Sequence, residues 1–340
     1  MTKIHQTSGR WRLGLALSIL TVLLWGILPI ALTVTLQVLD VYTLTWFRFF
    51  ISFVLLAIYL GWRGKLPTLV QLRLTSWKLL VIATVFLASN YILYLQGLAL
   101  TSPSNAQVII QLAPFLMGLG GLVIFRERYT LSQWIGVTIL IAGFILFFHD
   151  QLFQSLIKVS QYTNLPMTNT SIQVSKFFIS HNKTIIFNAS KQYLLGSSLI
   201  VLAAVTWAIY ALAQKQLLQS LSSTSIMLII YGGCTLCFSL LAKPQIIFTL
   251  DLFHWGMLIF CGLNTLIAYG AFAEALEHWE ASRVSAVLAS TPIVTFLSVW
   301  IVSVISPNLI NSEQTTFVGI IGAFLVVAGS IAIALRRKTK

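Results

Sequence analysis

Long apolar runs separated by short polar segments make up most of the chain. In a lipid bilayer every backbone N–H and C=O needs a partner within the protein, so apolar runs of about 20 residues form helices. A transmembrane β-barrel would need alternating segments of about ten residues, and these runs do not alternate. The pattern predicts an all-α integral membrane protein with ten transmembrane helices, at approximately 13–35, 41–62, 79–100, 104–124, 131–148, 194–213, 224–242, 253–273, 284–305 and 315–335.

The composition also indicates that lipid is the solvent for most of the chain. Hydrophobic residues make up 58% of the sequence, charged residues only 9%, and the mean hydropathy is +0.90. A soluble domain carries about 25% charged residues. The first apolar run is longer than the core of a cleavable signal peptide, and nine more runs follow, so we expect it to be retained as a span.

The net charge of +13 does not indicate nucleic-acid binding, because the basic residues are spread over the segments between the apolar runs. Lys and Arg gather on the cytoplasmic side of membrane proteins. With the N-terminus inside, the outer segments hold Lys158, Lys176, Lys183, Lys191 and Lys243. The inner segments hold Lys3, Arg10, Arg12, Arg63, Lys65, Arg73, Lys78, Arg126, Arg128, Lys215, Arg283, Arg336, Arg337, Lys338 and Lys340. We therefore predict a multi-pass protein of the bacterial plasma (inner) membrane with both termini in the cytoplasm.

The segment 149–193 differs from the rest, because it is rich in Ser, Thr, Asn, Gln and Lys. We interpret it as an extracytoplasmic linker between two halves. Asn169, Asn182 and Asn188 each begin an N-x-S/T sequon, which would matter only in a protein of the secretory pathway. The predicted organisation is a cytoplasmic segment 1–12, a five-helix repeat 13–148, the linker 149–193, a second five-helix repeat 194–335 and a basic cytoplasmic tail 336–340.

The two sides of this linker resemble each other. Trp25 in the first run matches Trp207 in the sixth, and Pro114 matches Pro292. The run Gln96-Gly-Leu…Ser104 matches Glu274-Ala-Leu…Ser282, and Gly136…Gly143 matches Gly322…Gly329. Five is an odd number, so the second set of five spans crosses the membrane in the opposite sense to the first. Such inverted repeats give a carrier two related conformations, one open to each side.

The chain resembles members of the drug/metabolite transporter superfamily, EamA type. The resemblance is carried by Trp25-Gly…Pro29, Thr45-Trp-Phe-Arg48, Asn90-Tyr-Ile-Leu-Tyr-Leu-Gln-Gly-Leu-Ala-Leu-Thr-Ser-Pro-Ser104-Asn-Ala, Pro114, Arg126-Glu-Arg128, Ala275-Leu, Ala281-Ser and Pro292. It covers nearly the whole chain except the linker. The resemblance implies ten helices in two inverted halves, a central substrate cavity, and export or exchange of metabolites.

Polar side chains inside the apolar runs are the candidates for substrate binding, because burying a polar group in hydrocarbon is costly. Arg48 could bind an anionic group or pair with a gate residue; alternatively its stem reaches the outer headgroups or caps a helix. Two pairs are spaced four apart and so share helix faces; they could line a cavity or simply join helices. The full predicted set is Trp25, Arg48, Asn90, Tyr94, Gln107, Gln111, Trp207, Asn264 and Tyr269. For the two tryptophans, core filling is an alternative.

Glu274 and Arg283 are predicted near the cytoplasmic ends of the eighth and ninth spans. They could form an inner gate, and a carboxylate beside a membrane cavity could carry a coupling proton. Pro114 and Pro292 each remove one helical hydrogen bond and could supply kinks for gating, although kinks also occur in static bundles. We treat these four residues as gating or coupling candidates.

The motifs of other function classes are missing from the sequence. It has no phosphate-binding loop, no H-E-x-x-H or G-x-S-x-G motif, and no histidine cluster, so we predict that the protein is not an enzyme. Cys234, Cys237 and Cys261 lie in apolar runs without further metal ligands, so neither a metal nor a cofactor is expected. The expected partners are a small-molecule metabolite and membrane lipid, with a homodimer left open. The leading hypothesis is a secondary transporter working by alternating access; the alternatives are a scaffold or sensor that uses the 149–193 loop, or an intramembrane enzyme.

Overall fold

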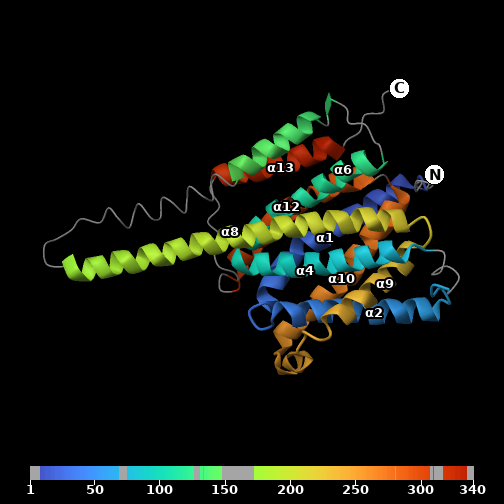
Figure 1. Cartoon of the computed structure of the whole chain (residues 1–340), viewed down its shortest axis with the longest axis horizontal. Helices are drawn as coiled ribbons and strands as arrows, with labels where there is room; N and C mark the ends of the chain where they lie inside the picture. The colour runs from blue at the N-terminus through green and yellow to red at the C-terminus, as the bar shows by residue number, and fades with distance from the viewer. Residues whose placement is uncertain are drawn as a thin grey trace.

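The computed structural model shows a bundle of long helices that lie roughly side by side (Figure 1). It describes residues 8–68, 75–125, 131–132, 134–147, 172–279, 281–306, 309 and 317–334. The tail 336–340, the turn 126–128 and residues 149–171 of the predicted linker lie outside this part. The helices are α1 (Trp11–Thr35), α2 (Val41–Trp62), α4 (Trp77–Leu100), α5 (Pro103–Ile109), α6 (Leu112–Phe125), α8 (Ile172–Leu217), α9 (Ser223–Phe238), the 3-10 helix η1 (Pro244–Thr249), α10 (Leu252–His278), α11 (Ala281–Leu288), α12 (Thr291–Ile305) and α13 (Phe317–Ala334).

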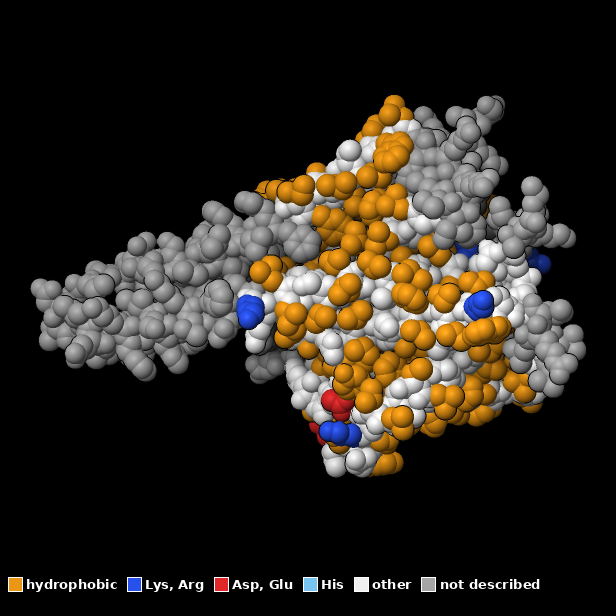
Figure 2. All heavy atoms as spheres, in the orientation of Figure 1, with side chains coloured by type: hydrophobic (Ala, Val, Ile, Leu, Met, Phe, Trp, Pro, Cys, Tyr) orange, Lys and Arg blue, Asp and Glu red, His pale blue; other side chains and the backbone are white. Residues whose placement is uncertain are grey.

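The predicted class, an all-α integral membrane protein, is confirmed. Among the described residues, five helices are long and apolar enough to cross a membrane: Trp11–Thr35, Val41–Trp62, Trp77–Leu100, Lys191–Leu217 and Leu252–His278. Shorter apolar helices occupy Trp134–Phe147, Ser223–Phe238, Thr291–Ile305 and Phe317–Ala332. Figure 2 shows hydrophobic side chains spread over one face of the bundle, with few charged side chains among them. Large apolar residues such as Leu23, Ile58 and Trp300 are exposed on the surface, as expected for a protein solvated by lipid.

The fourth and ninth predicted spans are each two helices, which corrects the prediction of continuous runs at 104–124 and 284–305. The first break separates α5 from α6 at Ile110 and Gln111, and the second separates α11 from α12 at Ala289 and Ser290. A proline cannot donate to the carbonyl four residues before it. For Pro114 that carbonyl belongs to Ile110, and it accepts instead from Ala113 N at 2.8 Å. The two halves thus carry broken helices at corresponding positions, a common feature of substrate sites in transporters.

The helix α8 is longer than the sixth predicted span. It begins at Ile172 and ends at Leu217, so it includes the second part of the segment predicted as a linker. Its N-terminal portion extends beyond the bundle, whereas its C-terminal portion lies beside α4 (Figure 1).

The halves are inverted with respect to each other. The helix α1 is antiparallel to α10, because the start of α1 at Gly14 approaches Trp279 while Thr21, further along, donates to Ala268 O at 3.3 Å. In the same way α4 is antiparallel to α8, because Asn90 donates to Ala203 O while Gly97, further along α4, contacts the earlier Ile200. Two reversals separate α1 from α4, so these helices run in one direction, and α8 and α10 run in the other. The first helix of each half therefore packs on the third helix of the other half, as a pseudo-two-fold axis in the membrane plane requires.

Aspartate caps fix the starts of two helices that carry site residues. Asp40 accepts hydrogen bonds from the N–H groups of Tyr42 and Thr43, both at 3.0 Å, and begins α2. Asp251 begins α10 and accepts from His254 N at 2.8 Å. The hydrogen bonds from the His254 backbone and ring lower the pKa of Asp251. Both caps satisfy backbone donors that the helix itself leaves unpaired.

Candidate functional site

A central cavity lies between the two halves, and the space within its walls and mouth, open solvent included, is about 700 Å³. Its walls come from α1, α2, α4, α5 and α6 of the first half and from α8, α10, α11 and α12 of the second. They include Ile110 and Gln111 of the first helix break, and Leu288 and Thr291 on either side of the second. The structure brings together at this cavity the predicted residues Trp25, Arg48, Asn90, Tyr94, Gln107, Gln111, Trp207 and Tyr269, and also Pro114.

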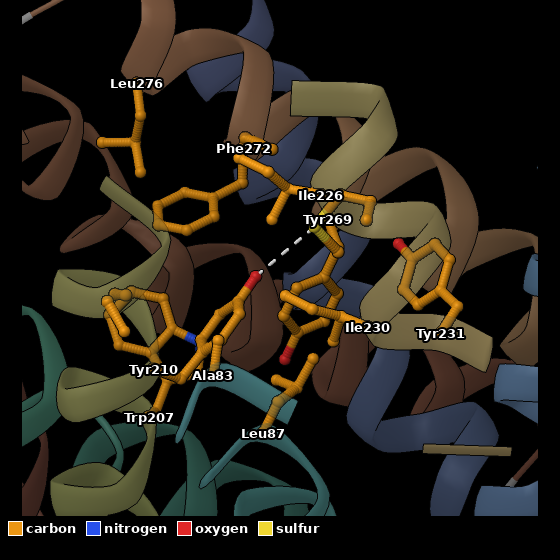
Figure 3. Close-up of a cluster of buried hydrophobic side chains, with 14 of the residues drawn as sticks. Ala83, Leu87, Trp207, Tyr210, Ile226, Ile230, Tyr231, Tyr269, Phe272 and Leu276 are labelled. Atoms are coloured by element: carbon orange, nitrogen blue, oxygen red, sulfur yellow. Dashed lines mark hydrogen bonds between the residues drawn. The ribbon is translucent and has the colours of Figure 1, made fainter. Parts of the chain in front are cut away.

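Aromatic rings from both halves meet at one end of the cavity. The ring centroids of Trp25 and Trp207 lie 6.1 Å apart in an edge-to-face arrangement, and Tyr269 lies 4.9 Å from Trp25. Phe272 contacts both tryptophans, with centroids at 5.6 and 5.3 Å. Figure 3 shows Trp207, Tyr210, Tyr269 and Phe272 in the cluster of buried side chains around Leu87 and Ile230. The two tryptophans therefore line the cavity and also fill the core, which are the two roles considered from the sequence.

Arg48 is deeply buried in the wall of the cavity, with 3% of its surface exposed. Its Nε donates to Thr265 Oγ1 at 2.9 Å, and its guanidinium carbon lies 4.5 Å from the centre of the Tyr91 ring. Thr265 donates in turn to Cys261 O at 2.9 Å. Burial to this degree excludes the alternative that the Arg48 side chain reaches the outer headgroups.

The amide side chains of α5 and the adjoining turn form the polar side of the cavity. Gln107 and Gln111 are 5% and 2% exposed, and they lie on one face, as their spacing predicts. Tyr94 Oη donates to Gln107 Oε1 at 3.3 Å, so α4 and α5 are joined here. Gln111 Nε2 donates to Gln107 O at 3.4 Å, whereas Gln111 Oε1 is buried without a hydrogen-bond partner. That oxygen can accept a hydrogen bond from a bound molecule.

Two asparagines join the halves through hydrogen bonds to the backbone. Asn90 Nδ2 donates to Ala203 O at 2.8 Å, which links α4 to α8. Asn264 Nδ2 donates to Leu24 O at 2.7 Å, which links α10 to α1. Asn264 is not among the residues that line the cavity, so its part in substrate binding stays a prediction. In this structure its side chain forms a polar contact between two helices.

We expect Asn90→Ala and Asn264→Ala to destabilise the protein by similar amounts, about 1 kcal/mol each. Each substitution removes the donor and leaves a backbone carbonyl of the opposite half without this bond. Unfolding of the purified protein in detergent by increasing denaturant would measure the effect. A loss at one position with no change at the other would show that the two contacts are not equivalent.

Several residues that line the cavity could not be recognised as cavity residues from the sequence. Tyr91, Ile110, Leu288 and Thr291 line the cavity, yet apolar and aromatic residues in an apolar run look the same whether they face lipid, core or a cavity. Thr291 begins α12 directly after the second helix break. Its place in the wall could have been inferred only from the match between Pro114 and Pro292.

The four predicted gating residues lie on four different helices, α6, α10, α11 and α12. Glu274, near the end of α10, faces His278 with 3.2 Å between Oε1 and Nε2, and it accepts a hydrogen bond from Ser223 Oγ at the start of α9. Ser8 Oγ lies 2.7 Å from His278 Nδ1, so the segment before α1 joins this cluster. Pro114 lines the cavity, and Pro292 is buried at the start of α12. Arg283 is half-buried on α11.

A family model, several relatives and a solved structure each match nearly the full length of this chain. The family model described as the EamA-like transporter family matches residues 12–149 and 194–335. The uncharacterized inner membrane transporter YhbE of Escherichia coli K12 is 34% identical over 326 residues, which cover 95% of this chain and 91% of that protein. An uncharacterized transporter of Haemophilus influenzae is 33% identical, with 96% of both chains covered. A solved crystal structure shares the fold with a TM-score of 0.60, 17% identity, and coverage of 94% and 96%.

Proposed function

The chain belongs to the EamA-like transporter family, and from this premise we propose that it is a secondary transporter of a small metabolite in the bacterial plasma membrane. We place the substrate in the central cavity and propose alternating access as the mechanism, without chemical change of the substrate. The observation that carries the proposal is a cavity lined by polar and aromatic groups between two inverted halves.

Part of the cavity lining is formed by equivalent residues of the two repeats. Each second-half residue in the lining has an equivalent residue in the first half, at the spacing set by the matching motifs of the repeats, and that residue also lines the cavity. The pairs are Trp25 and Trp207, Tyr91 and Tyr269, Ile110 and Leu288, and Ala113 and Thr291. These residues surround the pseudo-two-fold axis, where a substrate would stay in contact with both halves in either state.

The rest of the cavity is asymmetric. Residues of the first half extend it in one direction, among them Leu32, Tyr94, Gln107 and Gln111. Their counterparts at the repeat spacing, Gln214, Phe272, Ser285 and Ala289, are not among the residues that line this cavity. A cavity that extends into one half without the matching extension into the other is what one of two exchanging states should look like. By the predicted orientation, this state is open toward the extracytoplasmic side.

We propose that the cluster of Ser8, Ser223, Glu274 and His278 helps to close the predicted cytoplasmic end. It joins the segment before α1 to α9 and α10, so helices of both halves are held together there. In this state Glu274 is engaged by His278 and Ser223. A coupling proton on Glu274 stays a prediction, as does a gate formed with Arg283.

The experiment that tests the function is flux from liposomes that contain the purified protein and are loaded with a labelled metabolite mixture. We expect Leu28→Trp to lower the flux severalfold, because Leu28 lines the cavity and the larger ring would fill part of it. Leu23→Trp is the matched control on the same helix, since Leu23 is 48% exposed on the outer surface of the bundle. Both variants should keep the folded yield of the wild type. Absence of flux from folded wild-type protein, or equal flux through both variants, would contradict the proposal.

A further inference from the structure

We propose that the transported metabolite is a small organic anion with one anionic group, which Arg48 binds in the cavity. The inference rests on the proposed transport function and names the substrate class of the same site. It is carried by the placement of a single buried cation in a wall that offers no negative charge.

Arg48 is held in place but keeps unused hydrogen-bonding capacity. The guanidinium has five N–H donors. Within the described residues, its one side-chain hydrogen bond runs from Nε to Thr265 Oγ1, and Tyr91 lies below its plane. The terminal nitrogens Nη1 and Nη2 are therefore left for another partner. Two parallel N–H donors match the two oxygens of a carboxylate, and a charge-assisted pair of this kind is among the strongest polar contacts.

The described residues supply no counterion for this charge. Arg48 takes part in neither of the ion pairs His254–Asp251 and His278–Glu274, and it is the one charged residue in the cavity lining. A buried guanidinium stays protonated, and burying it without an anion is costly. A substrate anion would supply the missing charge, whereas a cationic substrate would be repelled.

The repeat indicates one anionic group rather than two. Ile230, a fully buried apolar residue, stands in α9 at the position equivalent to Arg48 in α2. Two contacts support this equivalence. Gly233 follows Ile51 at the same spacing as Ile230 follows Arg48, and Gly262 follows Thr84 at the same spacing as Tyr269 follows Tyr91. The contact of Ile51 with Gly262 is therefore repeated by the contact of Gly233 with Thr84. The proposed opposite-facing state therefore adds no second cation at this place, and Arg48 would hold the same group throughout.

The remaining walls define the body of the substrate. Gln111 Oε1 is unpartnered and 2% exposed, so it suits a hydroxyl, amide or amine hydrogen on the substrate. Trp25 and Tyr269 add an aromatic surface to the cavity wall. The site fits a monocarboxylate with a flat or apolar portion and a hydrogen-bond donor.

The test uses a bacterial metabolite extract divided on an anion-exchange resin at pH 7 into retained and unretained fractions. Liposomes with wild-type protein are loaded with either fraction, and export is followed by mass spectrometry. Labelled 4-hydroxyphenylacetate and its uncharged amide serve as a matched pair of defined probes. We expect flux from the retained fraction and, within the pair, preference for the acid over the amide.

The Arg48 variants separate substrate binding from folding. We expect Arg48→Gln to lower export of the retained compounds at least about tenfold, and Arg48→Lys to keep part of it, with folded yield measured by size-exclusion chromatography. If Arg48→Gln does not fold, the comparison of fractions on wild-type protein decides. Export of unretained compounds alone, or undiminished anion export by folded Arg48→Gln, would overturn the substrate class while transport stands. Absence of export from both fractions would overturn the transport function itself.

Discussion

Substitution of Gly329 by alanine is expected to remove most of the folded protein. Gly329 on α13 lies against the helix Trp134–Phe147, and an added Cβ would be 2.4 Å from Leu140 N and 2.7 Å from Gly136 O. These are backbone atoms, so no side chain can turn away and the two helices would have to separate. Overpacking of this kind costs about 3 kcal/mol. Expression followed by size-exclusion chromatography and thermal unfolding would measure the loss.

The matched control is Gly256→Ala on α10. A Cβ at Gly256 meets nothing within 4 Å, and the residue is exposed. Alanine favours helix over glycine, so this variant should be as stable as the wild type or slightly more so. If Gly329→Ala were equally well tolerated, the close approach of these helices would not contribute to the fold.

The overall fold could be predicted from the sequence, whereas the exact course of single helices could not. Apolar length predicts the membrane class. The spacing of seven residues places Gly136 and Gly143 on one helix face and Gly322 and Gly329 on another, and in the structure these two faces pack against each other. The helix breaks were not predicted, because Ile110, Gln111 and Ala289 are compatible with a continuous helix. The breaks depend on the prolines that follow and on the hydrogen bonds that the freed carbonyls find in the folded bundle.

The candidate site could be predicted where a residue is polar in an apolar run. Arg48, Gln107 and Gln111 were found in this way, and they all line the cavity. The same reasoning failed to separate Asn90, which lines it, from Asn264, which does not. Both side chains bond to a backbone carbonyl of the other half, and only the packing around them decides which one also faces empty space. The use of these residues by a substrate stays a prediction.

The symmetry of the fold and the asymmetry of the cavity together define what should change during transport. The paired residues around the axis belong to both states, whereas Gln111 and its counterpart Ala289 exchange their surroundings under the proposed mechanism. Gln111 lines the cavity in this state, whereas Ala289, directly after α11, is not among the lining residues. Since α5 and α11 are the counterpart half-helices, opening at one should accompany closing at the other.

Thiol labelling of these two positions from either side of the membrane would test the exchange. Gln111→Cys and Ala289→Cys are placed separately in a protein whose Cys234, Cys237 and Cys261 are alanine and whose flux has been verified. With a membrane-impermeant reagent, we expect Gln111→Cys to react at least about tenfold faster from the extracytoplasmic side, and Ala289→Cys at least about tenfold faster from the cytoplasmic side, because each is reached only in the state open to that side. Intact cells and inverted vesicles supply the two orientations. Reaction of both thiols from the same side would exclude the inverted arrangement of the pathway, and a permanently unreactive Ala289→Cys would exclude the opposite-facing cavity.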